Sequence, residues 1–458
     1  MNKQNRRAIL IIVDSLPADL FADLLSKNEL PNINKFLINR GTYITHCTTS
    51  FPSVSFSTHA TILTGSVCKN HGIPGVRWFS RKEKLNRTYT GPTWRYLNQD
   101  LMIDVRTIFD RLEEKSSCIW EPVSRGANNF IRMPRLLGRS CVTRAIQEIN
   151  NDSKFICLWF PSMDMIGHIF GSDSKVLRFV MKRIDRNLGK LFLKLERDKL
   201  FEETLVVLSS DHGQRKTSNH FDLISHLKDS GFQVSGRLYD RLSPQSFYDR
   251  DIVVCTEGNG SAHIYLKNSL QKREVIESLF DKPGVRQIFK KDHDVIRVYD
   301  RNRNESEIRF RNSEKPLSEW QLSYLVHGKK DPLGIYPDFL SNRKMGKDKF
   351  YSANEWLSLT FSSPSPDIPV QICQLLLSKR AGDIVVSSDT GWDLRTWWHR
   401  GTHGGSLPQE MTVPLVISGP DQNSSTKKYA RTIDIVPTIL KFLGYEQPAE
   451  IDGNPIDI

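Results

Sequence analysis

The feature that most constrains the fold is a set of short apolar runs, rich in β-branched residues, most of which end at a polar residue. They are AILIIVD (8–14), KFICLWF (154–160), TLVVLSSDHG (204–213), GDIVVSSD (382–389) and TVPLVISG (412–419). A continuous apolar run of this length is typical of a strand that is buried on both faces of a sheet. Stretches with helical spacing of apolar residues, such as 173–198 and 434–444, lie between or after these runs. Strands that alternate with helices predict an α/β fold with a doubly wound, mostly parallel sheet.

The middle of the chain follows a different pattern. From about residue 216 to 379 the segments are shorter and more polar, as in GNGSAHIYLK and RVYDRNRNESEIRFRN. The chain has 458 residues, which exceeds the size at which one hydrophobic core usually continues to grow. We therefore expect an α/β core formed by residues 1–215 and 380–458, with an inserted cap or variable subdomain formed by residues 216–379.

Polar residues that suit a metal site follow four of the apolar runs. In open α/β sheets, ligands bind beyond the carboxyl ends of the strands. Three Asp and three His occupy such positions, namely Asp14, Asp164, His168, Asp211, His212 and His403. Mixed carboxylate and imidazole ligands suit Zn²⁺ first and Mn²⁺ second. The sequence therefore predicts two divalent metal ions at this edge of the sheet.

Each of these residues also has an ordinary structural interpretation. An Asp after a strand is often a helix N-cap, and a lone buried His usually satisfies its hydrogen bonds within the core. Asp164 and His168 also have the spacing of an ion pair on one helix face. The metal hypothesis is favoured because these separate explanations must all hold at four strand ends. We expect His59 to serve helix packing and the remaining eight histidines to be structural or exposed.

The stretch TTSFPSVSFSTHATILTG (48–65) combines many hydroxyl groups with the start of a helical pattern. A Ser or Thr at a helix N-terminus can act as a nucleophile beside metal ions, while free backbone N–H groups there bind a phosphoryl oxygen. Most of these hydroxyls are expected only to cap the helix. The residues alone do not choose the nucleophile among Ser53, Ser55, Ser57 and Thr58.

The order of the motifs IVDSLP, FPSVSFSTHATILTG, DMIGHIFG, SSDHG and GTHGG resembles the alkaline phosphatase superfamily, and within it the type I phosphodiesterase/nucleotide pyrophosphatase group. The similar part covers roughly residues 6–215 and 380–458. The resemblance implies that Ser55 is the nucleophile and lies between two metals. It assigns Asp164, His168 and His403 to one metal, and Asp14, Asp211 and His212 to the other. Thr58 stands where many members of the group carry an Asn that helps to hold a phosphoryl oxygen, so Thr58 is a second candidate catalytic residue.

The resemblance implies metal-dependent hydrolysis of a phosphodiester or nucleotide pyrophosphate bond through a phosphoseryl intermediate. A phosphomonoesterase or phosphonate hydrolase of the same superfamily remains an alternative, because it would use the same metals and nucleophile. From another class, a basic nucleic-acid-binding protein with a structural metal site is the second alternative. A sulfatase is rejected, because Val54 stands where the sulfatase signature continues with Arg.

Charge and cysteine usage narrow the partners and the compartment. The formal net charge of +12 is compatible with nucleic acid, an anionic membrane surface or a phosphorylated small substrate as partner, and also with a basic surface that is only solvated. Together with the resemblance, it leads us to expect a small anionic, phosphate-containing substrate. No recognised nucleic-acid-binding motif is found, and the apolar run near the N-terminus is too short to span a membrane. Seven scattered cysteines without a CxxC pair are typical of reduced thiols, so we expect a cytoplasmic protein. The oligomeric state cannot be inferred from the sequence.

Overall fold

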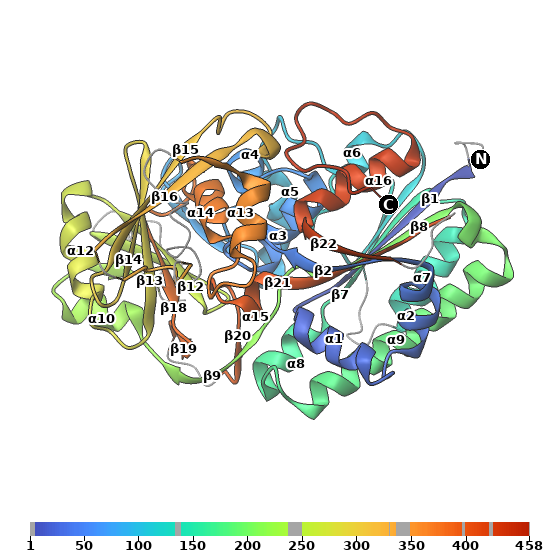
Figure 1. Cartoon of the computed structure of the whole chain (residues 1–458), viewed down its shortest axis with the longest axis horizontal. Helices are drawn as coiled ribbons and strands as arrows, with labels where there is room; N and C mark the ends of the chain where they lie inside the picture. The colour runs from blue at the N-terminus through green and yellow to red at the C-terminus, as the bar shows by residue number, and fades with distance from the viewer. Residues whose placement is uncertain are drawn as a thin grey trace.

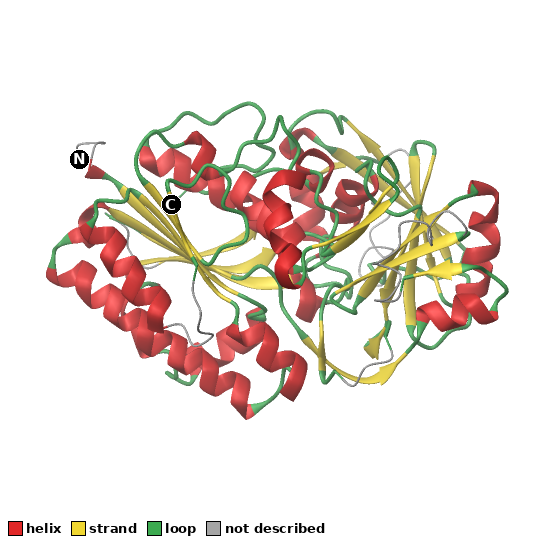
Figure 2. Ribbon diagram, turned by 180° about the vertical axis from the view of Figure 1, so that it is seen from behind, coloured by secondary structure: helices red, strands yellow, loops and turns green. Residues whose placement is uncertain are grey.

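Two β-sheets, each covered by helices, lie side by side along the long axis of the molecule (Figures 1 and 2). The computed structural model describes residues 5–132, 139–236, 250–328, 330–335, 349–395, 399–420 and 425–457. Residues 237–249, 329 and 336–348 of the predicted insert lie outside the described residues.

The first sheet confirms the predicted doubly wound α/β core. Its eight described strands have the order β22-β2-β21-β8-β1-β7-β5-β6, in which β8, β1, β7, β5 and β6 run parallel to one another and β21 is antiparallel to β8. The strand bounds are β1 Arg7–Val13, β2 Gly41–Thr48, β5 Ser116–Ile119, β6 Asn129–Ile131, β7 Phe155–Phe160, β8 Thr204–Ser209, β21 Thr412–Ser418 and β22 Ser425–Arg431. Four of the five predicted core strands are β1, β7, β8 and β21.

Alternate residues of β1 enter two separate hydrophobic cores, one on each face of the sheet. Ile9 and Ile11 pack into one core, whereas Leu10 and Ile12 pack into the other. The first core is covered by α1 Ala18–Ser26, α2 Pro31–Phe36, α7 Arg139–Asn150, α8 Ser162–Phe170 and α9 Lys175–Arg197. The second is covered by α3 Ser55–Thr64, α5 Leu97–Asp100, α6 Ile108–Arg111 and α16 Ile435–Leu443. The short helices α4 Cys68–His71 and α15 Pro408–Met411 instead contribute Cys68 and Met411 to a third core. A continuous apolar strand is thus explained by burial on both faces.

The second sheet is built mainly from the predicted insert and is mostly antiparallel. Its nine described strands have the order β10-β11-β12-β18-β13-β14-β15-β16-β17. They are β10 Val234–Ser235, β11 Ile252–Glu257, β12 Ser261–Leu266, β13 Val285–Asp292, β14 Val295–Asp300, β15 Glu305–Arg311, β16 Gln321–His327, β17 Tyr351–Ser352 and β18 Ile384–Ser388. The helices α10 Leu223–Asp229, α12 Lys272–Leu279, α13 Ala353–Thr360 and α14 Ile368–Leu376 belong to this half.

The placement of β18 corrects one prediction. The run 382–389 was expected in the core sheet, but β18 pairs with β12 and β13 of the second sheet. An apolar run shows that a strand is buried and does not show which strands it pairs with. The domain limits at residues 216 and 379 stay a prediction, although the second sheet extends beyond residue 379.

Smaller elements and one buried ion pair join the two halves. A three-stranded sheet contains β9 Arg215–His220 between β19 Gly391–Asp393 and β20 Gly401–Thr402, and β3 Arg77–Ser80 pairs with β4 Leu85–Thr88. Asp367, the N-cap of α14, accepts bonds from Nε and Nη2 of Arg431 at 2.7 and 2.8 Å. Arg431 ends β22, so this pair ties the insert to the core sheet. Among the described helices, none has the length and apolar character that a membrane crossing requires.

Candidate active site

The predicted metal ligands meet at the carboxyl ends of three adjacent parallel strands. Asp14 directly follows β1, and Asp211 with His212 comes just after β8. Asp164 and His168 lie on α8, which follows β7. Because β7, β1 and β8 are neighbours in the sheet, their ends bring these side chains to one edge. His403 reaches the same place from the loop after β20.

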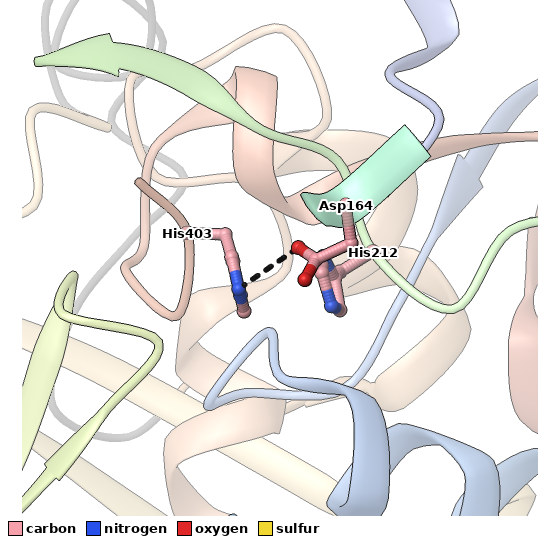
Figure 3. A group of neighbouring side chains, drawn as sticks. All are labelled: Asp164, His212 and His403. Atoms are coloured by element: carbon pink, nitrogen blue, oxygen red, sulfur yellow. Dashed lines mark ion pairs between the residues drawn. The ribbon is translucent and has the colours of Figure 1, made fainter. Parts of the chain in front are cut away.

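Asp164, His168 and His403 form a close group. Nε2 of His403 lies 3.3 Å from Oδ1 of Asp164, and Nε2 of His168 lies 3.4 Å from the same oxygen. The two Nε2 atoms are 3.2 Å apart. Figure 3 shows His403 directed at Asp164, with His212 beside them. The three residues that the resemblance assigned to one metal are therefore together in space.

Asp14, Asp211 and His212 form a second group next to the first. Nε2 of His212 lies 3.3 Å from Oδ2 of Asp211 and 3.6 Å from Oδ1 of Asp14. The rings of His212 and His403 stack with their centroids 3.9 Å apart, so the two groups adjoin. His212 also lies close enough to Asp164 and His403 to form a potential ligand group with them.

The three histidines are oriented in the same way. Nδ1 of His168 donates to the carbonyl of Gly401 at 2.9 Å, and Nδ1 of His212 donates to that of Gly213 at 3.0 Å. Nδ1 of His403 donates to the carbonyl of Ser53 at 3.1 Å. A carbonyl only accepts, so each Nδ1 carries a proton and each Nε2 is the nitrogen turned toward the carboxylates of the site. This arrangement is the one that metal-binding histidines adopt.

The carboxylates of the site are under-satisfied. Oδ1 of Asp14, Oδ1 of Asp164 and Oδ2 of Asp211 are buried atoms without a hydrogen-bond partner among the described residues. Burial, and then repulsion from Asp211 and Asp164, raises the pKa of Asp14 well above its ordinary value. An unpartnered buried carboxylate is costly unless it is neutralised or binds a cation.

The imidazoles complete a donor set that suits divalent cations. Burial, and then the neighbouring His212, lowers the pKa of His403 to about 3, which keeps its ring neutral. Burial alone would raise the pKa of Asp164, but His168 and His403 hold it well below the ordinary range. Carboxylate oxygens of Asp14, Asp164 and Asp211 with imidazole nitrogens of His212 and His403 form two potential ligand groups, and this mixture of donors matches the preferences of Zn²⁺ and Mn²⁺.

Ser55 is the hydroxyl of the 48–65 stretch that faces this donor set. It is the first residue of α3, and its Oγ lies 3.2 Å from Nε2 of His212. Ser53 bonds to the backbone of Gly405 and Gly404, and Ser57 donates to the carbonyl of Ile73. The first N–H groups of a helix have no partner within the helix, so they are free to bind an anion beside Ser55.

Thr58 is placed differently from Ser55. It is fully buried one turn further along α3, and its hydroxyl lies 3.3 Å from that of Ser50. No described contact joins it to the metal-ligand residues. Its catalytic role stays a prediction.

His59 has more than the packing role expected from the sequence. Its Nδ1 lies 2.8 Å from Oε2 of Glu121, and its Nε2 lies 3.3 Å from Oδ2 of Asp211. Burial alone would lower the pKa of His59, but Glu121 and Asp211 raise it to about 10. Sequence reasoning missed Glu121, which comes shortly after the four-residue strand β5. The rule that polar residues at strand ends are functional would have found it had that short strand been recognised.

An aromatic cavity of about 380 Å³ lies next to Ser55. Phe56, the neighbour of Ser55, lines it together with Trp159, the residue paired with Ile12 two positions before Asp14. The other aromatic lining residues are Tyr89, Trp94, Trp120 and Phe130. The sequence did not predict this cavity, because its walls come from elements that lie far apart in the chain, such as α3, β6 and β7.

The predicted insert supports one of the metal-ligand residues. The carbonyl of Gly258 accepts bonds from the backbone N–H of His403 at 3.3 Å and from the hydroxyl of Thr402 at 3.2 Å. The N–H of Gly260 donates to the carbonyl of His403 at 2.7 Å. Gly258 has a positive φ of 53°, and a Cβ there would lie 2.5 Å from Nδ1 of His403. Glycine is therefore required for this close approach.

Comparison with known proteins identifies similar sequences. The family described as type I phosphodiesterase/nucleotide pyrophosphatase matches residues 8–406. An uncharacterized pyrophosphatase/phosphodiesterase of Schizosaccharomyces pombe is 26% identical over 216 residues, which cover 43% of this chain and 44% of the relative. A bis(5'-adenosyl)-triphosphatase of Mus musculus is 24% identical over 274 residues, which cover 55% of this chain and 58% of the relative. The chain thus spans about half the length of these curated relatives.

Solved structures share the fold at lower sequence identity. Human ectonucleotide pyrophosphatase/phosphodiesterase 5 has a TM-score of 0.63 and 16% identity, covering 98% of this chain and 97% of its own. An inactive variant of the murine protein in complex with AMP has a TM-score of 0.60 and 16% identity, covering 96% of both chains. At this identity the structures establish the fold alone. The family match, which takes in most of the chain and all six predicted metal-ligand positions, establishes more: the chain belongs to the type I phosphodiesterase/nucleotide pyrophosphatase family of the alkaline phosphatase superfamily.

Proposed function

We propose that this chain hydrolyses phosphodiester or nucleotide pyrophosphate bonds, with Ser55 as the nucleophile and two divalent cations as cofactors. The observation that carries the proposal is the position of the Ser55 hydroxyl. It stands at the start of α3 and 3.2 Å from Nε2 of His212, where the two Asp/His groups adjoin. A nucleophile beside two such groups suits in-line displacement at phosphorus.

Each cation has a proposed set of three protein ligands. Asp164, His168 and His403 would hold one, and Asp14, Asp211 and His212 would hold the other, with Zn²⁺ or Mn²⁺ as the ion. Ser55 is a further ligand in the same proposal. Bound there, the two cations would supply electrostatic stabilisation for the attacking and leaving oxygens. The unpartnered oxygens of Asp14, Asp164 and Asp211 support this assignment.

The protein groups perform two displacement steps. Oγ of Ser55 forms a bond to phosphorus, its proton is released, and the bond between phosphorus and the leaving oxygen breaks, so that an alcohol or phosphate departs. Water then attacks the phosphoseryl group, which releases the second product and restores the hydroxyl of Ser55. The free N–H groups in the first turn of α3 face the region of the phosphoryl oxygens and stabilise their charge.

The aromatic cavity beside Ser55 favours a substrate with a flat ring, such as a nucleotide. Phe56 and Trp159 offer faces on which a base can stack, within the cavity of about 380 Å³. The names of two relatives agree, because one is a bis(5'-adenosyl)-triphosphatase and the other was solved with AMP. The net charge of +12 favours an anionic substrate in general.

The test compares bis-p-nitrophenyl phosphate, p-nitrophenyl phosphate and diadenosine triphosphate as substrates of the zinc- or manganese-loaded protein. We expect metal-dependent hydrolysis of the diester and the anhydride, and a loss of at least about 1000-fold in kcat for Ser55→Ala. Ser57→Ala is the matched control, because the hydroxyl of Ser57 in the same helix turns to the carbonyl of Ile73. A clear preference for p-nitrophenyl phosphate would replace the diester assignment by a monoesterase. Full activity of Ser55→Ala would overturn the proposed nucleophile.

A further inference from the structure

Three buried side chains form a continuous polar contact behind the second ligand group. Glu121, His59 and Asp211 are each 0% exposed, and the ring of His59 lies between the two carboxylates at 2.8 and 3.3 Å. The three come from different elements, since Glu121 follows β5, His59 lies on α3 and Asp211 follows β8. A polar contact that joins separate elements at zero exposure is expensive to desolvate, so it calls for a reason beyond packing.

The two carboxylate oxygens of Asp211 have different neighbours, and this difference shows how His59 can act on Asp211. Oδ1 of Asp211 accepts from the backbone N–H groups of Ser15 and His212 at 3.0 and 2.9 Å. Oδ2 is the oxygen that faces both His59 and Nε2 of His212. The backbone thus holds one oxygen, and the other lies between His212, a proposed ligand, and His59, which lies outside the ligand group.

Glu121 is directed at His59 by an unusual backbone turn. The preceding residue, Trp120, has a φ of +66°, a left-handed conformation that is strained for a bulky residue. This turn places Trp120 in the wall of the aromatic cavity and Glu121 against His59. The other oxygen of Glu121 accepts from the N–H of Val123 at 3.1 Å, which fixes the carboxylate further.

Simple helix packing does not account for His59. The apolar contacts of α3 with the core are made by Ala60, Ile62 and Leu63. A buried residue that served only to fill space would be at least as stable if it were apolar. Both ring nitrogens of His59 instead face carboxylate oxygens, and the ring packs against Trp159 in a T-shaped pair at a centroid distance of 5.2 Å.

We propose that His59 and Glu121 are positioning residues that orient the Asp211 carboxylate toward the metal of the Asp14, Asp211 and His212 group. The inference rests on the proposed metal-dependent function. Neither residue touches the substrate or the metal, because His59 acts through Asp211 and Glu121 acts through His59. Outer contacts of this kind typically change metal affinity by about 10- to 100-fold.

The test is a Co²⁺ titration of the metal-free full chain, followed by visible absorbance, which does not require hydrolysis. The wild type is expected to show two sites. Glu121→Gln retains the size of the side chain and removes its charge, and His59→Leu removes both polar contacts. Each variant is expected to weaken one site by about 10- to 100-fold and to leave the other within about 2-fold. His59→Gln, whose amide can still reach toward Asp211, is expected to recover part of the loss.

Asp185→Asn is the matched control, because Asp185 is also a buried carboxylate but bonds to Asn32 and Ile33 between α9 and α2. It is expected to leave both affinities unchanged. If His59→Leu does not fold, as judged by its thermal transition, Glu121→Gln decides the test. Two wild-type affinities in Glu121→Gln, or equal weakening of both sites, would overturn the positioning role alone. A wild type that binds no cobalt would overturn the proposed metal centre together with it.

Discussion

Two groups of buried charges differ in how completely their partners are supplied by the protein. At the junction of insert and core, Asp367 accepts from Arg431, and also from Gln371 and Thr48. Burial would lower the pKa of Arg431, but Asp367 raises it above the ordinary value, so the guanidinium keeps its charge. At the strand ends, Asp14, Asp164 and Asp211 each turn an unpartnered oxygen toward the same space. The first group is complete without a ligand, whereas in the proposed function the second group is completed by cations.

The largest effect is expected from breaking the complete pair. Arg431→Leu leaves the Asp367 carboxylate buried without its cation, which should lower the free energy of unfolding in urea by about 3–5 kcal/mol. The double variant Arg431→Leu/Asp367→Leu should recover much of this loss, because no unpaired charge remains. If Arg431→Leu were as stable as the wild type, the contrast would fail, because the ion pair with Asp367 would then contribute no stability.

The next largest effect is expected when zinc is added to the Asp and His residues at the strand ends, because bound zinc should stabilise the folded chain. Zinc at a free concentration 100 times its dissociation constant should raise the free energy of unfolding by about 2.7 kcal/mol per site, since only the folded chain presents the assembled ligands. The measurement is the thermal midpoint with zinc and with a chelator. Asp211→Asn serves as the control and should show a smaller shift. An identical midpoint in zinc and chelator would contradict the comparison.

A smaller effect is expected when one charge, that of Asp14, is removed from the metal-free protein. This substitution should raise stability rather than lower it. Asp14→Asn removes a carboxylate whose pKa is raised by burial and by repulsion from Asp211 and Asp164. We expect it to stabilise the metal-free chain by about 1 kcal/mol. The same change at Asp185 should destabilise by about 1 kcal/mol, because Asp185 accepts bonds from Ile33 and Asn32. Both variants are measured by urea unfolding in the presence of a chelator. If Asp14→Asn and Asp185→Asn both lowered stability, Asp14 would not differ from an ordinary hydrogen-bonded carboxylate.

The smallest effect concerns Glu257, a buried carboxylate that accepts backbone hydrogen bonds and keeps a raised pKa. It accepts from the N–H groups of Val76 and Arg77, yet burial raises its pKa well above 4.5. Since the folded state then holds a proton that the unfolded state loses, the stability that Glu257 contributes is present below about pH 4.5 and lost as the pH rises through the folded pKa.

Glu257→Gln should remove this dependence. Between pH 5 and pH 8, the free energy of unfolding of the wild type should fall by on the order of 1 kcal/mol relative to that of the variant. The measurement is urea unfolding in the presence of a chelator. Equal pH dependence in both proteins would show that the protein supplies Glu257 with a complete set of partners, as it does for Asp367.

The sequence predicted the features that depend on local order along the chain. The apolar runs before Asp14 and Asp211 located their strands, and the rule of strand ends correctly predicted that the candidate ligands share one edge of the sheet. It failed for β18, because the apolar run 382–389 looks the same in either sheet and its partners lie within the insert. Contacts between distant segments, such as His59 with Glu121, leave no periodic pattern. The cytoplasmic location stays a prediction.

The two backbone hydrogen bonds that join His403 to Gly258 and Gly260 have a consequence for engineering. A designer who exchanges the insert for that of a relative, in order to alter the substrate, would also exchange the backbone clamp that holds this histidine. Such chimaeras inherit their metal affinity from the grafted part as well as from the recipient core. A successful graft therefore has to carry the glycine turn at residues 258–260 with it.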